Sequence, residues 1–354
     1  MQEKMSHNLF CEVTFFIARK RGFVMEDTII LTQSEVSACL SMREAIDAVK
    51  VAYSAFANGR VQMPSVQHLD VHQYNGEVDI KSGFVEDFRL MGTKIASGFY
   101  DNQKKGLPPG IAVIVLLDLK TSMPLAIMDG THITAYRTGA AGAVAASFLA
   151  RKDSERIGIV GAGTQGCMQL LALRELFDIQ NVKVWDIKQE MATRYKDQMS
   201  KQLSIDIQVV NKPDAAVPDS DILVTATPSR KALINADSIH DGIHINAIGA
   251  DGPGKQELDP HIMTRASKIV VDSLEQCRKI GEIQHALNQG IINESKIHAE
   301  IGEIINGKKS GRESDDEITL FDSTGLSAQD IAAAKIVYDT AKKKGLGQRI
   351  NLLG

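Results

Sequence analysis

Residues 156–177 read RIGIVGAGTQGCMQLLALRELF, and this stretch decides the fold class of the chain. It begins as an apolar strand, continues into a turn with the glycine spacing GxGxxG, and ends as a run of helix-forming residues. In such a turn Gly161 permits the tight bend, Gly163 lets the backbone approach a pyrophosphate, and Gly166 lets helix and sheet pack closely. The order strand, turn, helix therefore predicts a dinucleotide-binding βαβ unit, with cofactor contacts from Gly161, Gly163, Thr164, Gln165 and Gly166.

The strand pattern after this helix ends in an acidic residue, Asp186, within VKVWDIK. It follows Gly161 by about 25 residues, near the position where dinucleotide-binding folds carry an acid that accepts hydrogen bonds from ribose hydroxyls. The same charge repels a 2′-phosphate, so the sequence predicts NAD rather than NADP as the cofactor. Lys188 lies close by, and the alternative that this lysine accommodates the 2′-phosphate of NADP stays open.

The rest of the chain shows two different patterns. After residue 177, short apolar segments alternate with helical or loop stretches, as in a parallel sheet with crossover helices. These segments read NVKVWDI (181–187), DIQVV (206–210), DILVTAT (221–227), HINAIGA (244–250) and KIVVDS (268–273). The N-terminal part instead predicts an amphipathic helix over 41–59 and a mostly antiparallel set of strands, including 66–71 and 111–119. An alanine-rich helix over 134–151 bridges the two parts, and an amphipathic helix over 327–344 is placed to return to the first.

Composition excludes several classes of function. The 354 residues carry a net charge of −4 without a dense basic block, which gives no electrostatic footprint for nucleic acid. No apolar run approaches the roughly 20 residues of a membrane span. The four cysteines are far apart and predict plain thiols in a reducing compartment, the cytoplasm, with no metal site. Residues 1–24 are interpreted as a disordered N-terminal extension, because their apolar patch precedes their basic residues, the reverse of a secretory signal.

Three longer motifs resemble the ornithine cyclodeaminase/mu-crystallin family: RTGAAGAVAA (137–146), HINAIGADGPGKQEL (244–258) and FDSTGLSAQD (321–330). The resemblance covers nearly the whole chain from residue 25. Within the family, the sequences of these motifs are most similar to those of archaeal-type alanine dehydrogenases. It implies an α/β protein with a Rossmann-type doubly wound parallel sheet plus a second α+β substrate and dimerisation domain. The domain boundaries predicted are 25–145, completed by 326–354, for the substrate domain and 146–325 for the NAD-binding domain. A homodimer formed through the first domain is also implied.

The resemblance also implies roles for particular residues. Asp251, which handles the substrate nitrogen beside the nicotinamide, and Lys94 are the candidate catalytic residues, and Arg137 shares with Lys94 the binding of the substrate carboxylate. Further cofactor contacts are implied for Lys255, Thr138, Thr227, Gly249 and Ser323. Each has a plain alternative: Asp251 as a turn former, Lys94 as a surface residue and Arg137 as a structural ion-pair partner. His244, on an apolar strand, is interpreted as a core histidine rather than a base.

One part of the family pattern is missing. Relatives carry Arg or Lys two residues after a proline where this chain has Val66 after Pro64. Lys81 is a candidate substrate-binding cation that replaces it, although a surface position is equally open. Asp79 is the nearby candidate acid for the distal amine of a diamino acid.

The leading hypothesis is an NAD-dependent oxidoreductase acting on the CH–NH2 or C=N group of small amino or imino acids. Hydride transfer at such a carbon needs a cation for the carboxylate and a group that exchanges the nitrogen's proton. Two alternatives stay open: an ornithine cyclodeaminase, which consumes no cofactor overall, and a non-enzymatic ligand-binding protein resembling mu-crystallin.

Overall fold

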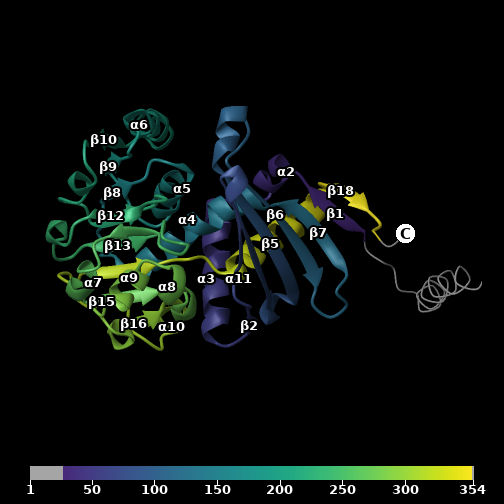
Figure 1. Cartoon of the computed structure of the whole chain (residues 1–354). Helices are drawn as coiled ribbons and strands as arrows, with labels where there is room; N and C mark the ends of the chain where they lie inside the picture. Colours follow the sequence, from purple (N-terminus) through teal and green to yellow (C-terminus); the bar gives the residue numbers. More distant parts are fainter. Residues whose placement is uncertain (1–26, 353–354) are drawn as a thin grey trace, which may run out of the picture.

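The computed structural model describes residues 27–352, so the predicted extension at 1–24 lies outside the described residues. It contains two eight-stranded sheets that lie side by side (Figure 1). We call them the mixed sheet and the parallel sheet. The helices are α2 Gln33–Ser37, α3 Met42–Ala57, α4 Gly130–Leu149, α5 Thr164–Arg174, α6 Gln189–Leu203, α7 Ile262–Arg265, α8 Leu274–Ile280, α9 Ile283–Asn288, α10 Ile301–Ile305 and α11 Ser327–Lys344. Short 3-10 helices are η1 His72–Tyr74, η2 Glu86–Phe88, η3 Tyr100–Lys105, η4 Pro213–Ala216, η5 Ala236–Ser238 and η6 Glu294–Lys296.

The parallel sheet has the strand order β10-β9-β8-β11-β13-β17-β15-β16. Its strands are β8 Arg156–Val160, β9 Asn181–Trp185, β10 Asp206–Val209, β11 Ile222–Thr225, β13 His244–Ala247, β15 Lys268–Val271, β16 Ile297–Glu300 and β17 Thr319–Asp322. A separate parallel pair is β12 Arg230–Ile234 with β14 Gln256–Leu258. The strand order reverses between β8 and β11, which is the switch point where doubly wound sheets bind ligands. The predicted Rossmann-type sheet is confirmed.

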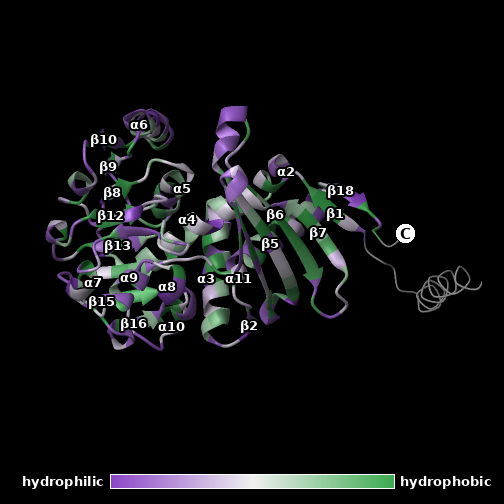
Figure 2. Ribbon diagram, in the orientation of Figure 1, coloured by the Kyte–Doolittle hydropathy of each residue, from purple (hydrophilic) through white to green (hydrophobic). Residues whose placement is uncertain are grey.

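Two hydrophobic cores explain why these strands read as unbroken apolar runs. Ile159 and Val224 pack in one core with α5 and α6, whereas Val160 and Leu223 pack in a second core with α7 and α9. Successive side chains of a strand point to opposite faces, so a sheet covered on both faces favours apolar residues at most positions. Figure 2 shows the result, with hydrophobic strands inside and a hydrophilic α6 at the periphery.

The mixed sheet has the order β18-β1-β7-β6-β5-β4-β2, with β3 paired to β4. Its strands are β1 Thr28–Leu31, β2 Val61–Gln62, β3 Gln67–Val71, β4 Gly76–Val85, β5 Leu90–Phe99, β6 Gly110–Asp118, β7 Pro124–Asp129 and β18 Gln348–Ile350. Most of the pairs are antiparallel, as predicted. Helix α11 covers one face of this sheet and contacts α3, β4 and β5 (Figure 1). Contact is close at Gly92, where an added Cβ would lie 2.8 Å from Ile331 Cγ1.

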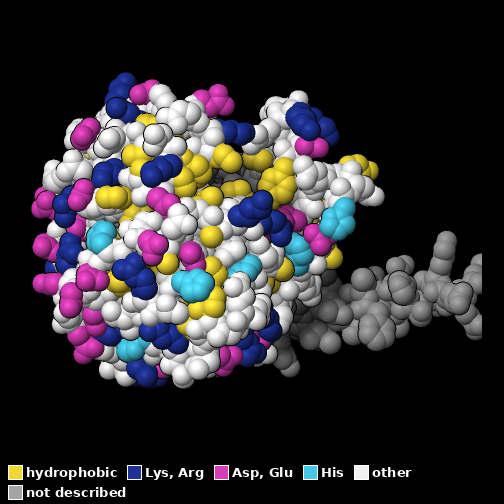
Figure 3. All heavy atoms as spheres, turned by 60° about the vertical axis from the view of Figure 1, so that its left-hand side comes forward, with side chains coloured by type: hydrophobic (Ala, Val, Ile, Leu, Met, Phe, Trp, Pro, Cys, Tyr) yellow, Lys and Arg dark blue, Asp and Glu magenta, His cyan; other side chains and the backbone are white. Residues whose placement is uncertain are grey.

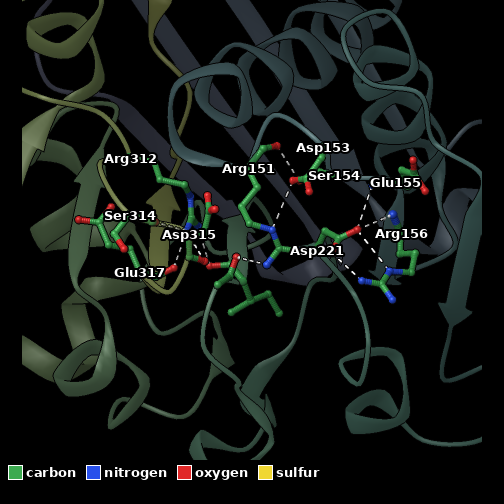
Figure 4. Close-up of polar contacts among 12 residues, drawn as sticks. Arg151, Asp153, Ser154, Glu155, Arg156, Asp221, Arg312, Ser314, Asp315 and Glu317 are labelled. Atoms are coloured by element: carbon green, nitrogen blue, oxygen red, sulfur yellow. Dashed lines mark hydrogen bonds and ion pairs between the residues drawn. The ribbon is translucent and has the colours of Figure 1, made fainter.

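Helix α4 connects the two sheets and is packed closely against α5. A Cβ at Gly139 would lie 2.5 Å from the backbone oxygen of Met168, and one at Gly142 would lie 2.0 Å from Oε1 of Gln169. The glycines of this alanine-rich helix therefore allow the approach of another helix. The connection from α4 to β8 is held by Asp221, whose carboxylate accepts hydrogen bonds from both arginines that flank it, Arg151 and Arg156 (Figure 4).

The charged loop at 307–317 is exposed along most of its length, and Arg312 connects it to the parallel sheet. Arg312 is only partly exposed and donates from Nε to the Leu149 carbonyl at 2.7 Å and from Nη2 to Thr319 Oγ1 at 3.1 Å. Its planar guanidinium reaches acceptors on several segments at once, which the sequence pattern does not reveal.

Cys39, Cys167 and Cys277 are free thiols, as predicted, and Cys11 lies outside the described residues. Within residues 27–352, no helix is long and apolar enough to cross a membrane.

Candidate functional site

The glycine turn lies at the switch point of the parallel sheet. Gly161 has a φ of +112°, which favours glycine, and a Cβ there would lie 2.5 Å from the Ala226 carbonyl oxygen. A Cβ at Gly166 would lie 2.1 Å from the Gly161 oxygen, so the helix packs directly on the turn. At Gly163, by contrast, a Cβ would meet nothing within 4 Å. The turn is tight at its first and third glycines and open at its second, and α5 begins there without a side-chain cap.

Asp186 follows β9 and connects that strand to the turn. One carboxylate oxygen accepts from the backbone N–H of Ala162 at 2.9 Å, and the other accepts from Lys188 N at 2.9 Å. Each carboxylate oxygen can accept a second hydrogen bond. Asp186 therefore holds the turn and keeps acceptor capacity for a ribose.

A cluster of buried cations lies on the helix-covered face of the mixed sheet. Lys81 on β4 is directly opposite Lys94 on β5, and Arg137 reaches them from α4. Lys94 Nζ lies 2.8 Å from Asp330 Oδ2 and Arg137 Nε lies 2.9 Å from Asp330 Oδ1. The Lys81 ammonium donates to the carbonyls of Thr324 and Gly325 at 2.9 and 3.0 Å. All three predicted cations therefore meet at one place.

Asp330, in the first turn of α11, is the counterion of this cluster. Its side chain is 2% exposed, as is that of Lys94. Burial opposes ionisation of Asp330, but Arg137 and Lys94 outweigh it and hold the pKa of this carboxyl below its usual value. Burial and the neighbouring Arg137 lower the pKa of Lys94 to about 7, although Asp330 opposes the shift. One acid thus holds two cations, and the cluster keeps an excess of positive charge.

The outer edge of Arg137, formed by its two Nη groups, remains available for further hydrogen bonds. Among residues 27–352, no group accepts a hydrogen bond from its two Nη atoms, whereas its Nε is paired with Asp330. The structural ion-pair role of Arg137 is therefore present, and it leaves the paired N–H groups that bind a carboxylate in bidentate fashion.

Asp251 and Lys255 form an ion pair on the nucleotide-binding side. Their Oδ1 and Nζ atoms lie 2.6 Å apart, and the Asp251 side chain is 49% exposed. Loss of hydration raises the pKa of Asp251, but Lys255, followed by Lys81 and Arg137, outweighs this and lowers it. The charges of Lys81 and Arg137 thus act on Asp251, so the two clusters belong to one electrostatic site.

A cleft of about 360 Å³ lies next to the Asp251–Lys255 pair, between the mixed sheet and the unit that contains the parallel sheet. Glu77 and Tyr100 line it from the mixed sheet, and Arg230 and Lys255 line it from the other unit. Figure 3 shows one face of the molecule, with a hollow that is surrounded by hydrophobic side chains.

Asp79 has a partner that the sequence did not reveal. Its Oδ1 lies 2.7 Å from His68 Nδ1, across the β3–β4 ladder. The hydrogen bond to Asp79 is the main cause that raises the pKa of His68. Val66, which stands in place of the expected cation, lines a separate cavity of about 150 Å³ together with Gln276 and Lys279.

The other predicted cofactor residues lie in neighbouring loops. Thr227 and Gly249 follow β11 and β13, and both donate a backbone N–H to Glu257. Thr138 is buried on α4, and Ser323 donates from its hydroxyl to Asp272 at 3.2 Å. Thr164 is exposed, and within the described chain nothing pairs with Gln165 Oε1.

His244 is fully buried, as predicted, with its ring nitrogens 2.9 Å from Thr319 Oγ1 and from Asn246 Oδ1. Burial lowers the pKa of His244 to about 3. Such a histidine is neutral at physiological pH and belongs to the core.

The parallel sheet with its glycine turn, joined to a second sheet that carries a cationic cluster, defines a two-unit Rossmann-type α/β protein. The family model "Ornithine cyclodeaminase/mu-crystallin family" matches residues 26–345, and the chain belongs to this family. The expected resemblance is thereby confirmed.

Relatives extend over almost the same length. Alanine dehydrogenase of Archaeoglobus fulgidus is 45% identical over 325 residues, which are 92% of this chain and 98% of that protein. The solved archaeal alanine dehydrogenase dimer with bound NAD has a TM-score of 0.87 at 45% identity, covering 92% of this chain and 99% of that one. Thermococcus litoralis Δ1-pyrroline-2-carboxylate reductase with NADH and L-proline has a TM-score of 0.88 at 39% identity, covering 91% and 100%.

Proposed function

We propose that the protein is an NAD-dependent oxidoreductase that acts on the CH–NH2 or C=N group of small amino or imino acids. The observation that carries the proposal is the unpaired edge of Arg137 beside Lys94, within electrostatic range of the Asp251–Lys255 pair. Relatives named as an alanine dehydrogenase and a pyrroline-2-carboxylate reductase support the same reaction class.

The residues present fit a dinucleotide. The open approach at Gly163 and the uncapped first turn of α5 would hold the pyrophosphate, because free N–H groups at a helix N-terminus bind anions. Asp186 would accept from the ribose hydroxyls and would disfavour a 2′-phosphate. Bound there, the nicotinamide supplies or takes the hydride at the carbon that carries the substrate nitrogen.

The cationic cluster would hold the substrate carboxylate. Arg137 offers two parallel N–H groups, and Lys94 offers a point charge that Asp330 keeps in place. Because the cluster is buried, its hydrogen bonds to a carboxylate act in a medium of low polarity, where they are stronger than in water. This fixes the orientation of the carbon next to the carboxylate.

Asp251 would act at the substrate nitrogen. An ionised carboxylate stabilises an iminium and can accept a proton from an ammonium group. The pairing with Lys255 and the lowered pKa keep Asp251 ionised near neutral pH. Its half-exposed position lets it exchange that proton with solvent.

The cyclodeaminase alternative is disfavoured by the environment of Asp79. That reaction needs a pocket acid for the distal ammonium of ornithine, and Asp79 is already paired with His68. Lys81, on the same strand and the same face, would repel a second ammonium group.

The test is a screen of NADH formation with L-alanine, L-proline, L-aspartate and L-ornithine, with ammonia measured in parallel. We expect one amino acid to reduce NAD, and Asp251→Asn to abolish this turnover. Asp259→Asn, a nearby acid paired with His261, is the matched control and should stay active. Ammonia from ornithine without net NADH would establish the cyclodeaminase instead, and NADH binding without turnover would favour a non-enzymatic binder.

The proposal includes the domain division given above, a location in the cytoplasm and a homodimer formed through the mixed sheet. The face of this sheet away from α11 carries Ile80, Ile95 and Val113 side by side across β4, β5 and β6. Exposed apolar patches of this kind mark interaction surfaces. Ile95→Lys should yield a monomer in light scattering, whereas Val51→Lys should not, although both parent residues are 45% exposed.

A further inference from the structure

Glu257 is a buried carboxylate that the proposed chemistry does not use. It lies on β14 with 0% exposure, and its two oxygens accept from the N–H of Thr227 at 2.6 Å and of Gly249 at 2.9 Å. Within the described chain, no ion pair includes Glu257. Its carboxylate joins two backbone segments.

These two segments are the loops at the carboxyl ends of neighbouring parallel strands. Thr227 follows β11 and Gly249 follows β13, the edge at which such sheets bind ligands. Thr227 also abuts the glycine turn, since a Cβ at Gly161 would lie 2.9 Å from Thr227 Cγ2. A Cβ at Gly249 would lie 2.6 Å from Glu257 Oε2 and 2.3 Å from the Thr227 carbonyl oxygen. The carboxylate, both loops and the turn are therefore packed without spare room.

A second buried acid, Glu282, binds the backbone of the strand that carries Glu257. The carboxylate of Glu282 accepts from the N–H of Glu257 at 3.0 Å and of Leu258 at 2.7 Å. The following turn, at the start of α9, continues the contact: Gln284 Oε1 accepts from Gly254 N at 3.0 Å, and His285 Nε2 lies 2.9 Å from the Lys255 carbonyl oxygen. The segment that carries the Asp251–Lys255 pair is thus fixed from its far side.

Glu257 is held in the core by hydrogen bonds, which oppose the effect of burial on its pKa. Burial raises the pKa of Glu257 to about 7, and burial and the nearby Glu257 raise that of Glu282. A buried acid without a cation is costly, and its oxygens must find donors. The backbone N–H groups of Thr227 and Gly249 are such donors.

We propose that Glu257 is a positioning residue of the cofactor site, which sets the spacing between the Thr227 and Gly249 loops against the nicotinamide half of the dinucleotide. Glu282 fixes Glu257 in turn. The inference rests on the proposed function, because it takes these loops to be the ones that face the cofactor.

The test is Glu257→Gln. Glutamine has nearly the same shape, but only one of its two terminal atoms accepts, so its NH2 group faces one of the loop N–H groups. Leaving one buried N–H unsatisfied weakens the arrangement by a factor of about 10 or more. We expect the Kd for NADH to rise by about that factor, measured through energy transfer from the single tryptophan, Trp185. The KM for NAD should rise in parallel, while the KM for the amino acid at saturating NAD changes little, because its carboxylate binds on the other sheet.

Asp221→Asn is the matched control, because Asp221 is also a buried acid that accepts from two backbone N–H groups, those of Glu155 and Arg156. It should lower the thermal midpoint and leave the Kd for NADH unchanged. Glu282→Gln is the second variant and should raise the Kd by a smaller factor than Glu257→Gln.

The inference is overturned if the Glu257→Gln protein binds NADH like the wild type. A loss of stability alone, with normal NADH binding in both the Glu257→Gln and the Glu282→Gln proteins, has the same consequence. Failure of the wild-type protein to bind NADH would instead refute the proposed function itself.

Discussion

Substitution of Asp330 by Asn tests how the buried cations are held. In the folded protein this one carboxylate lies 2.8 Å from Lys94 and 2.9 Å from Arg137. The variant keeps the shape of the side chain and removes its charge. Two cations then face each other in the core without a counterion.

The size of the effect follows from the burial of the three side chains. Removing one partner of a buried ion pair costs roughly 3–5 kcal/mol. Lys94 limits the loss, because its pKa of about 7 lets it release its proton at little cost near neutral pH. We therefore expect the free energy of unfolding to fall by about 3 kcal/mol at a pH of about 8.

The loss should grow at lower pH. The folded-state pKa of Lys94 lies below its unfolded value, so folding releases a proton and stability rises with pH between the two values. Without Asp330 the folded pKa falls further. Below a pH of about 7, the wild type keeps Lys94 protonated while the variant does not, and the difference grows by about 1.4 kcal/mol per pH unit.

The assay is urea unfolding followed by circular dichroism at a pH of about 8 and of about 6. Asp339→Asn is the matched control, because Asp339 lies on the same helix and forms a half-exposed pair with Lys335. Such a pair contributes about 1 kcal/mol at most. A loss below about 1 kcal/mol for Asp330→Asn, or a loss that does not increase as the pH is lowered, would refute the reasoning.

Three further predictions concern other parts of the molecule. Asp221→Asn should lower the free energy of unfolding by about 2–4 kcal/mol in urea unfolding, since it weakens a buried acid that binds two arginines. Asp186→Ser should raise the Kd for NADH about tenfold and reduce the preference over NADPH, which fluorescence titration with both cofactors measures. The Kd of isobutyrate, a non-reacting carboxylate, should rise as the pH is raised through about 7, where Lys94 loses its charge; Lys94→Arg should flatten this profile, and an unchanged slope would count against the role of Lys94.

Local pattern was sufficient to predict the parallel sheet and several helices. Most strands of this sheet are buried on both faces and are visible as short apolar runs, whereas β16 Ile297–Glu300 and β17 Thr319–Asp322 were not among the predicted strands. The helix predicted over 327–344 is observed as Ser327–Lys344, because its apolar spacing and the lysines in its last turn are local properties. The family resemblance likewise implied that Lys94 and Arg137 lie together, whereas the position of Lys81 beside them was left open by the sequence and comes from the structure.

The roles of the acids that hold the site together could not be predicted from local sequence pattern. Asp330 and Glu257 both fall within the quoted motifs, but a motif does not show which groups they bind. Asp330 is 236 residues from Lys94 and 193 from Arg137, and Glu257 is 30 residues from Thr227. The position of Lys81 opposite Lys94 depends on the register of the β4–β5 hairpin, which no single strand specifies. The pairing of Asp79 with His68 depends on a second register of the same kind.

The return of α11 to the mixed sheet has a consequence for biosynthesis. The counterion of Lys94 and Arg137 is carried by this last helix, and β18 closes the edge of the same sheet. A chain still emerging from the ribosome can complete its parallel sheet first, since domains form as units during synthesis. Lys94 and Arg137 cannot gain this counterion until α11 has been released. We therefore expect a nascent chain that stops before α11 to lack the counterion of Lys94 and Arg137, even where its parallel sheet is already folded.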